Sequence, residues 1–153
     1  MSLDTVSMLL KEKKNSRLVS VMPTMSVAEA VRIMNSEKIG AVIVLDQQKL
    51  VGIFTERDAL VSVIGRGRDP LTTPVSEVMT SEVRSVEPAT QIVSAMKMMS
   101  ERRHRHLPVL DKGQVCGLIS MGDVTHWVIQ SQQETVNLAI NAVKQMGYSN
   151  RRG

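Results

Sequence analysis

Apolar and polar positions follow one another along this chain in an order that occurs twice. In the first half, the apolar run 18–21 predicts a short strand that Pro23 ends, because proline has no N–H to donate. Ser26 followed by Glu29 is the signature of a helix N-cap, and apolar residues at helical spacing follow over 27–34. The pattern predicts an amphipathic helix with one buried face.

Two apolar runs rich in β-branched residues come next, at 41–45 and 50–54. The polar residues between them are typical of a short turn, so the runs are predicted to pair as two strands. Helical spacing returns over 57–64. The first half therefore has the predicted order β-α-β-β-α, and the second half repeats it over 83–86, 92–101, 107–110, 115–119 and 122–130.

A shift of the chain by 65 positions aligns the two halves without a gap. It pairs Ser20 with Ser85, Pro23 with Pro88, Gly52 with Gly117 and Asp58 with Asp123. Such self-similarity indicates a tandem repeat, here residues 17–66 and 82–131. Because units of this size bury too little surface alone, the repeats are expected to pack together with pseudo-twofold symmetry and two clefts between them. The predicted fold class is α/β (α+β), with additional helices at both ends.

Three segments lie outside the repeats. Residues 1–16 are expected to form an N-terminal helix, and 67–81 a linker that starts as an exposed loop rich in Gly, Pro, Arg and Thr. Residues 132–153 are expected to form a C-terminal helix and tail, with a capping box that begins at Ser131 and an end at Gly147.

The composition is that of a folded globular protein, with 42% apolar and 22% charged residues. No apolar run reaches the roughly 18 residues of a membrane span, and the first residues do not resemble a secretory signal. Cys116 is the only cysteine, so it has no partner for a disulfide within the chain, and its apolar strand predicts an inert core position. We expect a soluble protein of the reducing cytoplasm.

The net charge of +4 favours partners that carry phosphate. The basic cluster 102–106 supports an alternative function as a nucleic-acid-binding module, although the chain has only three aromatic residues on which bases can stack. Within that cluster His104 and His106 alternate, but a structural zinc site needs four ligands, so no metal is expected. No nucleophile and base pair is apparent either, and we expect no enzyme activity.

The short phrase GIFTERD at 52–58 recurs as GLISMGD at 117–123. Taken alone, a hydroxyl residue with an acid three positions later is typical of a helix cap, and on that interpretation neither copy binds anything. Both copies, however, lie where a strand passes into a helix, an edge at which nucleotide sites are built. Free N–H groups there favour phosphate, and a carboxylate suits the hydroxyls of ribose. On this second interpretation each phrase is half of a nucleoside pocket.

These two phrases, with RHLPVLD at 105–111, resemble the two halves of a cystathionine-β-synthase (CBS) domain pair, or Bateman module. The resemblance covers residues 17–130 and implies a stand-alone CBS-pair protein without a catalytic domain or catalytic cofactor. It implies a signal-transduction and energy-sensing role, in which AMP, ADP, ATP, NAD(H) or S-adenosylmethionine binds between the repeats and a separate protein effector responds. AMP and NAD are the ligands we expect first.

The resemblance also places residues in two clefts, each shared between the repeats. One cleft is expected to combine Thr55, Arg57 and Asp58 with Arg105, His106 and Pro108. The other is expected to combine Ser120, Gly122 and Asp123 with Lys38, Gly40 and Ala41. The first cleft is expected to attract phosphates, because its two arginines suit phosphate oxygens, whereas Lys38 is the only evident basic residue of the second.

The last helix of the first repeat has almost no polar face over 59–64. One packed side cannot bury all of its apolar residues, so we expect a second subunit to cover the rest. A homodimer formed through the repeat helices agrees with what the resemblance implies.

Overall fold

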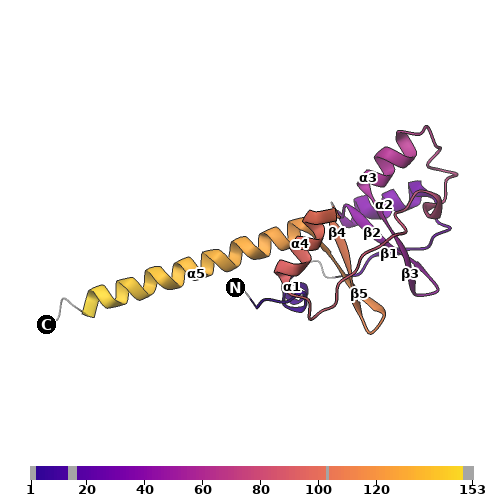
Figure 1. The fold of residues 1–153 in the computed structure, drawn as a ribbon. Helices are drawn as coiled ribbons and strands as arrows, with labels where there is room; N and C mark the ends of the chain where they lie inside the picture. The colour runs from indigo at the N-terminus through magenta and orange to yellow at the C-terminus, as the bar shows by residue number, and fades with distance from the viewer. Residues whose placement is uncertain (1–2, 14–16, 103, 150–153) are drawn as a thin grey trace.

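Two repeats and a long C-terminal helix make up the fold (Figure 1). The structure is a computed structural model that describes residues 3–13, 17–102 and 104–149. The first repeat contains β1 (Ser20–Val21), α2 (Val27–Glu37), β2 (Ala41–Asp46), β3 (Lys49–Thr55) and α3 (Glu56–Asp58), which continues as a π-helix over Ala59–Ile64. The second contains α4 (Ile92–Arg102), β4 (His106–Asp111), β5 (Gln114–Ser120) and α5 (Met121–Ser149). Outside them lie α1 (Val6–Glu12) and a 3-10 helix over Val75–Glu77.

The two sheets have the same pairings at positions 65 residues apart. In the first repeat β1 runs parallel to β2, with Val21 opposite Val44, and β2 is antiparallel to β3. In the second, β4 and β5 are antiparallel, and the predicted first strand is reduced to one parallel bridge between Val86 and Val109. The mixed α+β class predicted from the repeated pattern is confirmed.

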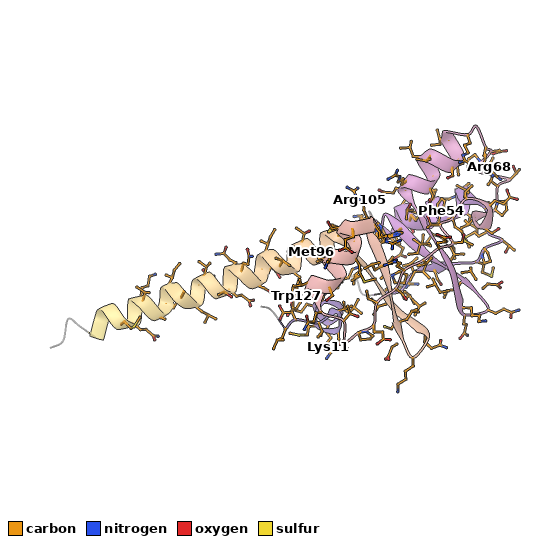
Figure 2. All side chains as sticks on the ribbon, in the orientation of Figure 1. Lys11, Phe54, Arg68, Met96, Arg105 and Trp127 are labelled. Carbon is orange, nitrogen blue, oxygen red and sulfur yellow. The ribbon has the colours of Figure 1, made fainter. Side chains whose placement is uncertain are left out.

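Each repeat has its own hydrophobic core, built from equivalent positions. Phe54 lies in the core of the first repeat with no exposed surface (Figure 2). Ser26 caps α2 as expected, since its hydroxyl accepts from the Glu29 amide at 3.2 Å. The repeat mates at the centres of the two cores, all fully buried, are Val42 and Leu107, Val44 and Val109, and Phe54 and Ile119.

The segment that precedes each repeat packs on the other repeat. Helix α1, ahead of the first repeat, buries Val6 and Leu9 in the core of the second. The linker ahead of the second repeat buries Val75 and Val78 in the core of the first. Thr73 is also buried, so the linker is not the fully exposed loop that its composition predicted.

The glycine that begins each repeated phrase permits this crossing. A Cβ on Gly52 would lie 2.5 Å from the Met79 sulfur and 2.9 Å from the Thr80 carbonyl oxygen. A Cβ on Gly117 would lie 2.9 Å from the Leu10 side chain. The segments therefore approach these strands more closely than a side chain would allow.

Helix α5 continues without a break from Met121 to Ser149 (Figure 1). The helix start predicted at Ser131 and the end predicted at Gly147 are therefore wrong, and the expected boundary after residue 131 falls inside one helix. No proline interrupts the sequence here, and the Ser131 hydroxyl donates to Asp4 at 3.2 Å instead of capping a new helix. The far half of α5 extends away from the repeats, with Val136, Ile140, Val143 and Met146 exposed.

None of the described helices is long and apolar enough to cross a membrane.

Candidate functional site

Both repeated phrases form reciprocal helix caps. The Thr55 hydroxyl accepts from the Asp58 amide at 3.2 Å, while the Asp58 carboxylate accepts from the Thr55 amide at 2.9 Å. In the second copy the Ser120 hydroxyl accepts from the Asp123 amide at 3.1 Å, and the Asp123 carboxylate accepts from the Ser120 amide at 2.8 Å. The cap interpretation of the phrase is therefore correct for its local structure, and any binding role is additional to it.

The two aspartates differ in the third group that reaches them. The Thr80 hydroxyl donates to Asp58 at 3.2 Å, whereas the Lys13 ammonium lies 2.9 Å from the Asp123 carboxylate. Thr80 and Lys13 occupy corresponding places, since each belongs to the segment that crosses onto the other repeat. One carboxylate thus meets a neutral hydroxyl and the other a cation.

A cavity of about 270 Å³ lies between the repeats on the Asp123 side. That volume is close to the lower end of small-molecule ligand pockets, at roughly 300 Å³. Helix α1 and the chain before β1 contribute one wall, and residues at the start of β2 and the end of β5 contribute others. The polar side chains of the lining are Lys13, Arg17, Lys38, His106, Ser120 and Asp123, and apolar contacts come from Leu10, Leu18, Val19, Ile39 and Leu118.

The second predicted set of residues is largely brought together. Ser120 and Asp123 line this cavity together with Lys38, Gly40 and Ala41 from the first repeat. Gly122 is exposed at the first turn of α5 and does not line it.

The first predicted set stays a prediction, since only one of its residues lines this cavity. His106 lines the same cavity as Asp123, so one residue expected in the first cleft lies in the second. Arg57 and Arg105 are exposed, and Pro108 is buried within β4 opposite Leu118. Thr55 and Asp58 are hydrogen-bonded to each other in the helix cap. Apart from His106, the residues of the first set do not line the cavity.

The expectation that Lys38 is the only basic residue of the second cleft is wrong. Lys13 and Arg17 also line it, as does His106. Lys13 precedes the first repeat and Arg17 is its first residue, so the alignment of the repeated phrases did not indicate either cation. The excess of positive charge near 11–17 was the only available signal, and it did not indicate which cleft the segment would reach.

Burial and neighbouring charges act in opposite directions on the titratable groups of the cavity. Burial alone raises the pKa of Asp123, but hydrogen bonds from Lys13 and the Ser120 amide, with the Lys13 charge, outweigh it and hold that pKa below its usual value. Burial lowers the pKa of His106, although the charges of Asp123 and Glu56 raise it in part. At neutral pH the site therefore holds an ionised Asp123 and a neutral His106.

We expect the stability of the protein to fall as the pH drops below about 6.5, the usual pKa of histidine. The unfolded chain then binds a proton at residue 106 that the folded chain resists, so the free energy of unfolding decreases toward the lower folded pKa of His106. Asp123 acts in a lower window, because its depressed pKa removes stability only below pH of about 3.8. Urea titrations should show that the free energy of unfolding decreases less between pH 7.5 and 5.5 in His106→Gln than in wild type. The exposed His126→Gln is the control. Equal losses in all three proteins would contradict the assignment.

Glu56 belongs to the first repeated phrase and contacts Gly40, which lines the Asp123 cavity. Its amide donates to the Gly40 carbonyl at 3.0 Å, and a Cβ on Gly40 would lie 3.2 Å from the Glu56 carboxyl carbon. The Glu56 charge also acts on His106, and because Gly40 and His106 both line the Asp123 cavity, this carboxylate lies beside that cavity. Repulsion by this carboxylate is unfavourable for an anion there.

Cys116 is exposed, so the expectation of a core cysteine is wrong. Val109 pairs with Gly117 and Leu110 with Val115, which leaves Cys116 as the unpaired residue of a β-bulge. Such a bulge breaks the alternation of inward and outward side chains from which the core position was inferred. Within 3–13, 17–102 and 104–149, no group of three or more His, Cys, Asp and Glu residues is placed to hold a metal ion.

The sequence profile of the CBS domain matches the chain twice, at residues 11–65 and 75–130. The chain belongs to the CBS-domain family. CBS domains are generally regulatory modules without catalytic activity. The match covers both repeats and reaches back to the segment that carries Lys13 and Arg17.

Known CBS proteins resemble the chain in sequence and in fold. CBS domain-containing protein CBSX3, mitochondrial, of Arabidopsis thaliana is 40% identical over 129 residues, which cover 80% of this chain and 62% of that protein's length. A putative signal-transduction protein with CBS domains from Burkholderia ambifaria is 40% identical, with a TM-score of 0.81 over 84% of this chain and 96% of the other. CBSX2, solved in complex with AMP, is 25% identical, with a TM-score of 0.67 over 84% and 98%.

Proposed function

We propose that this CBS pair is a regulatory module that binds an adenine nucleotide in the cavity at Asp123 and signals to a separate protein. The observation that carries the proposal is the cavity itself, where an ionised carboxylate lies among the cations Lys13, Arg17 and Lys38. A carboxylate suits ribose hydroxyls, cations suit phosphate, and the aliphatic lining suits a purine ring. The AMP bound by CBSX2 supports the same ligand class.

AMP is the ligand that the dimensions favour. A cavity of about 270 Å³ is small even for a mononucleotide, and NAD carries a second nucleotide that would have to extend beyond it. The Asp123 side of the module is favoured over the Asp58 side, because three cations line the cavity at Asp123, whereas Asp58 does not line it and its third contact is the uncharged Thr80 hydroxyl.

AMP is expected to raise the melting temperature of the protein by about 5–10 °C at a hundredfold excess over its dissociation constant. Ligand binding at that excess stabilises the folded state by about 2.7 kcal/mol, and each kcal/mol shifts a domain of this size by about 2–4 °C. The measurement is a thermal-shift series with AMP, ADP, ATP, NAD and adenosine, followed by calorimetry. A series in which none of these compounds changes the melting temperature would overturn the proposal.

The nucleic-acid alternative gains no support from the aromatic side chains. Phe54 is fully buried, and the ring nitrogen of the half-buried Trp127 donates to Asp4 at 2.8 Å, beside α1 (Figure 2). Neither ring therefore offers a platform on which bases can stack. One residue of the basic cluster, Arg103, lies outside the described residues, and the side chain of Tyr148 does as well.

The module is proposed to act as a homodimer through the helix that follows the first phrase. Leu60, Val61 and Ile64 are 62%, 49% and 71% exposed, an apolar face that a second copy would cover. We expect sedimentation to give a dimer for wild type and a folded monomer for the double variant Leu60→Ser, Ile64→Ser. A monomeric wild type at micromolar concentration would contradict this mode of assembly.

A further inference from the structure

The Lys13 ammonium is hydrogen-bonded to the Asp123 carboxylate, the group that would bind the ribose of a nucleoside. It donates to Asp123 Oδ2 at 2.9 Å and to the Leu118 carbonyl at 2.9 Å. Side chains of the pair are only 26% and 23% exposed, so the ion pair is partly shielded from solvent. Removing one partner of a shielded pair is costly, because it leaves the other charge without compensation.

The other half of the molecule lacks this feature. At Asp58 the corresponding place is taken by the Thr80 hydroxyl, which donates at 3.2 Å and carries no charge. The difference therefore does not follow from the helix cap, which both copies share. It follows from which residue of each crossing segment reaches the aspartate, Lys13 at Asp123 and Thr80 at Asp58.

Ribose binding and the Lys13 contact compete for one oxygen. Oδ2 of Asp123 already accepts from the Ser120 amide as well as from Lys13. To hold two vicinal hydroxyls, the carboxylate must use both of its oxygens, and Lys13 must then give up its place. An unphosphorylated nucleoside offers the displaced ammonium nothing in return, whereas a phosphate offers a charge-assisted hydrogen bond.

We propose that Lys13 is a displaceable counter-ion that makes the cavity selective for phosphorylated nucleosides, pairing with Asp123 in the free protein and with the ligand's phosphate in the complex. This inference rests on the proposed function, since it needs a nucleoside at Asp123. The exchange also affects α1, because Lys13 is the C-cap of that helix. Its amide donates to the Leu9 carbonyl at 3.0 Å. Leu9 is part of the core of the second repeat, so a displaced Lys13 acts directly on how α1 docks there.

The test compares AMP with adenosine in calorimetric titrations of wild type, Lys13→Met and Lys13→Arg. Methionine is unbranched like lysine and one atom shorter, and it removes the charge. Lys11→Met is the matched control because Lys11 is exposed on the last turn of α1. For Lys13→Met we expect AMP affinity to fall about tenfold and adenosine affinity to rise about threefold, the scale of one charge-assisted hydrogen bond. Lys13→Arg and Lys11→Met should keep the wild-type preference for AMP.

The outcomes separate this inference from the proposed function. If wild type binds both ligands and Lys13→Met leaves their affinity ratio unchanged, Lys13 is a structural ion pair and the inference is overturned while the proposed function stands. An equal loss of both affinities in Lys13→Met has the same meaning. Failure of wild type to bind either ligand overturns both proposals. If Lys13→Met is unfolded in a thermal scan, the charge-retaining Lys13→Arg decides, since a lost preference for AMP in that folded variant would also refute the exchange.

Discussion

Replacement of Asp123 by alanine is expected to weaken AMP binding by about 10- to 100-fold. Each hydrogen bond from a ribose hydroxyl to an ionised carboxylate contributes about 1.5–3 kcal/mol, and 1.4 kcal/mol is a factor of ten in affinity. Two such hydrogen bonds would give a larger loss of affinity, but the expected loss is smaller because AMP must first displace Lys13 from the carboxylate. Calorimetry with AMP measures the effect directly.

Asp58→Ala is the matched control for this substitution. Both variants lose the acid of a reciprocal helix cap, which costs about 1 kcal/mol of folding stability in each, and Asp123→Ala should lose more because it also leaves the Lys13 ammonium without its partner. Only Asp123 lines the cavity, and AMP affinity in Asp58→Ala should stay within about threefold of wild type, well below the tenfold expected from one charged hydrogen bond. The opposite ranking would assign the ligand to the Asp58 side, where the family resemblance led us to expect its phosphates.

Gly52→Ala is expected to lower the free energy of unfolding by about 2–3 kcal/mol, within the range of overpacked cores. The added methyl would lie 2.9 Å from the Thr80 carbonyl oxygen, which is backbone and is held by a hydrogen bond to Ile53 at 2.9 Å. It would also lie 2.5 Å from the Met79 sulfur. The crossing segment must shift or separate from β3, and a urea titration should show the loss as a lower midpoint.

Two other glycines calibrate this result. Gly117→Ala should cost less, because the atoms it would meet belong to the flexible end of Leu10. Gly122→Ala should raise the free energy of unfolding by about 0.5–1 kcal/mol, because alanine is the better helix former. The new Cβ would lie at an ordinary 3.5 Å from the Ser120 hydroxyl. If Gly52→Ala were as stable as wild type, close approach of the linker would not be the reason for that glycine.

Local sequence predicted the elements of each repeat well. Ser26 caps α2, Val42 and Phe54 face the core, and the two phrases cap the helices that follow them. These features depend on neighbours within a few positions, and the repetition of the pattern 65 residues later doubled the information. The errors arose where local signals competed with longer elements, as at Ser131, whose capping pattern lies in the middle of α5.

The sequence by itself determined that this chain is a pair of CBS repeats and that Asp58 and Asp123 are equivalent positions in them. Only the tertiary structure decided that the surroundings of the two aspartates differ. It brings Lys13, 110 positions away in the chain, onto Asp123, and a hydroxyl onto Asp58. The physical reason is that each crossing segment is held by the core of the other repeat, through Leu9 in one case and Val75 in the other. Core packing at that distance leaves no periodic signal in the sequence, yet it sets the charge beside each carboxylate.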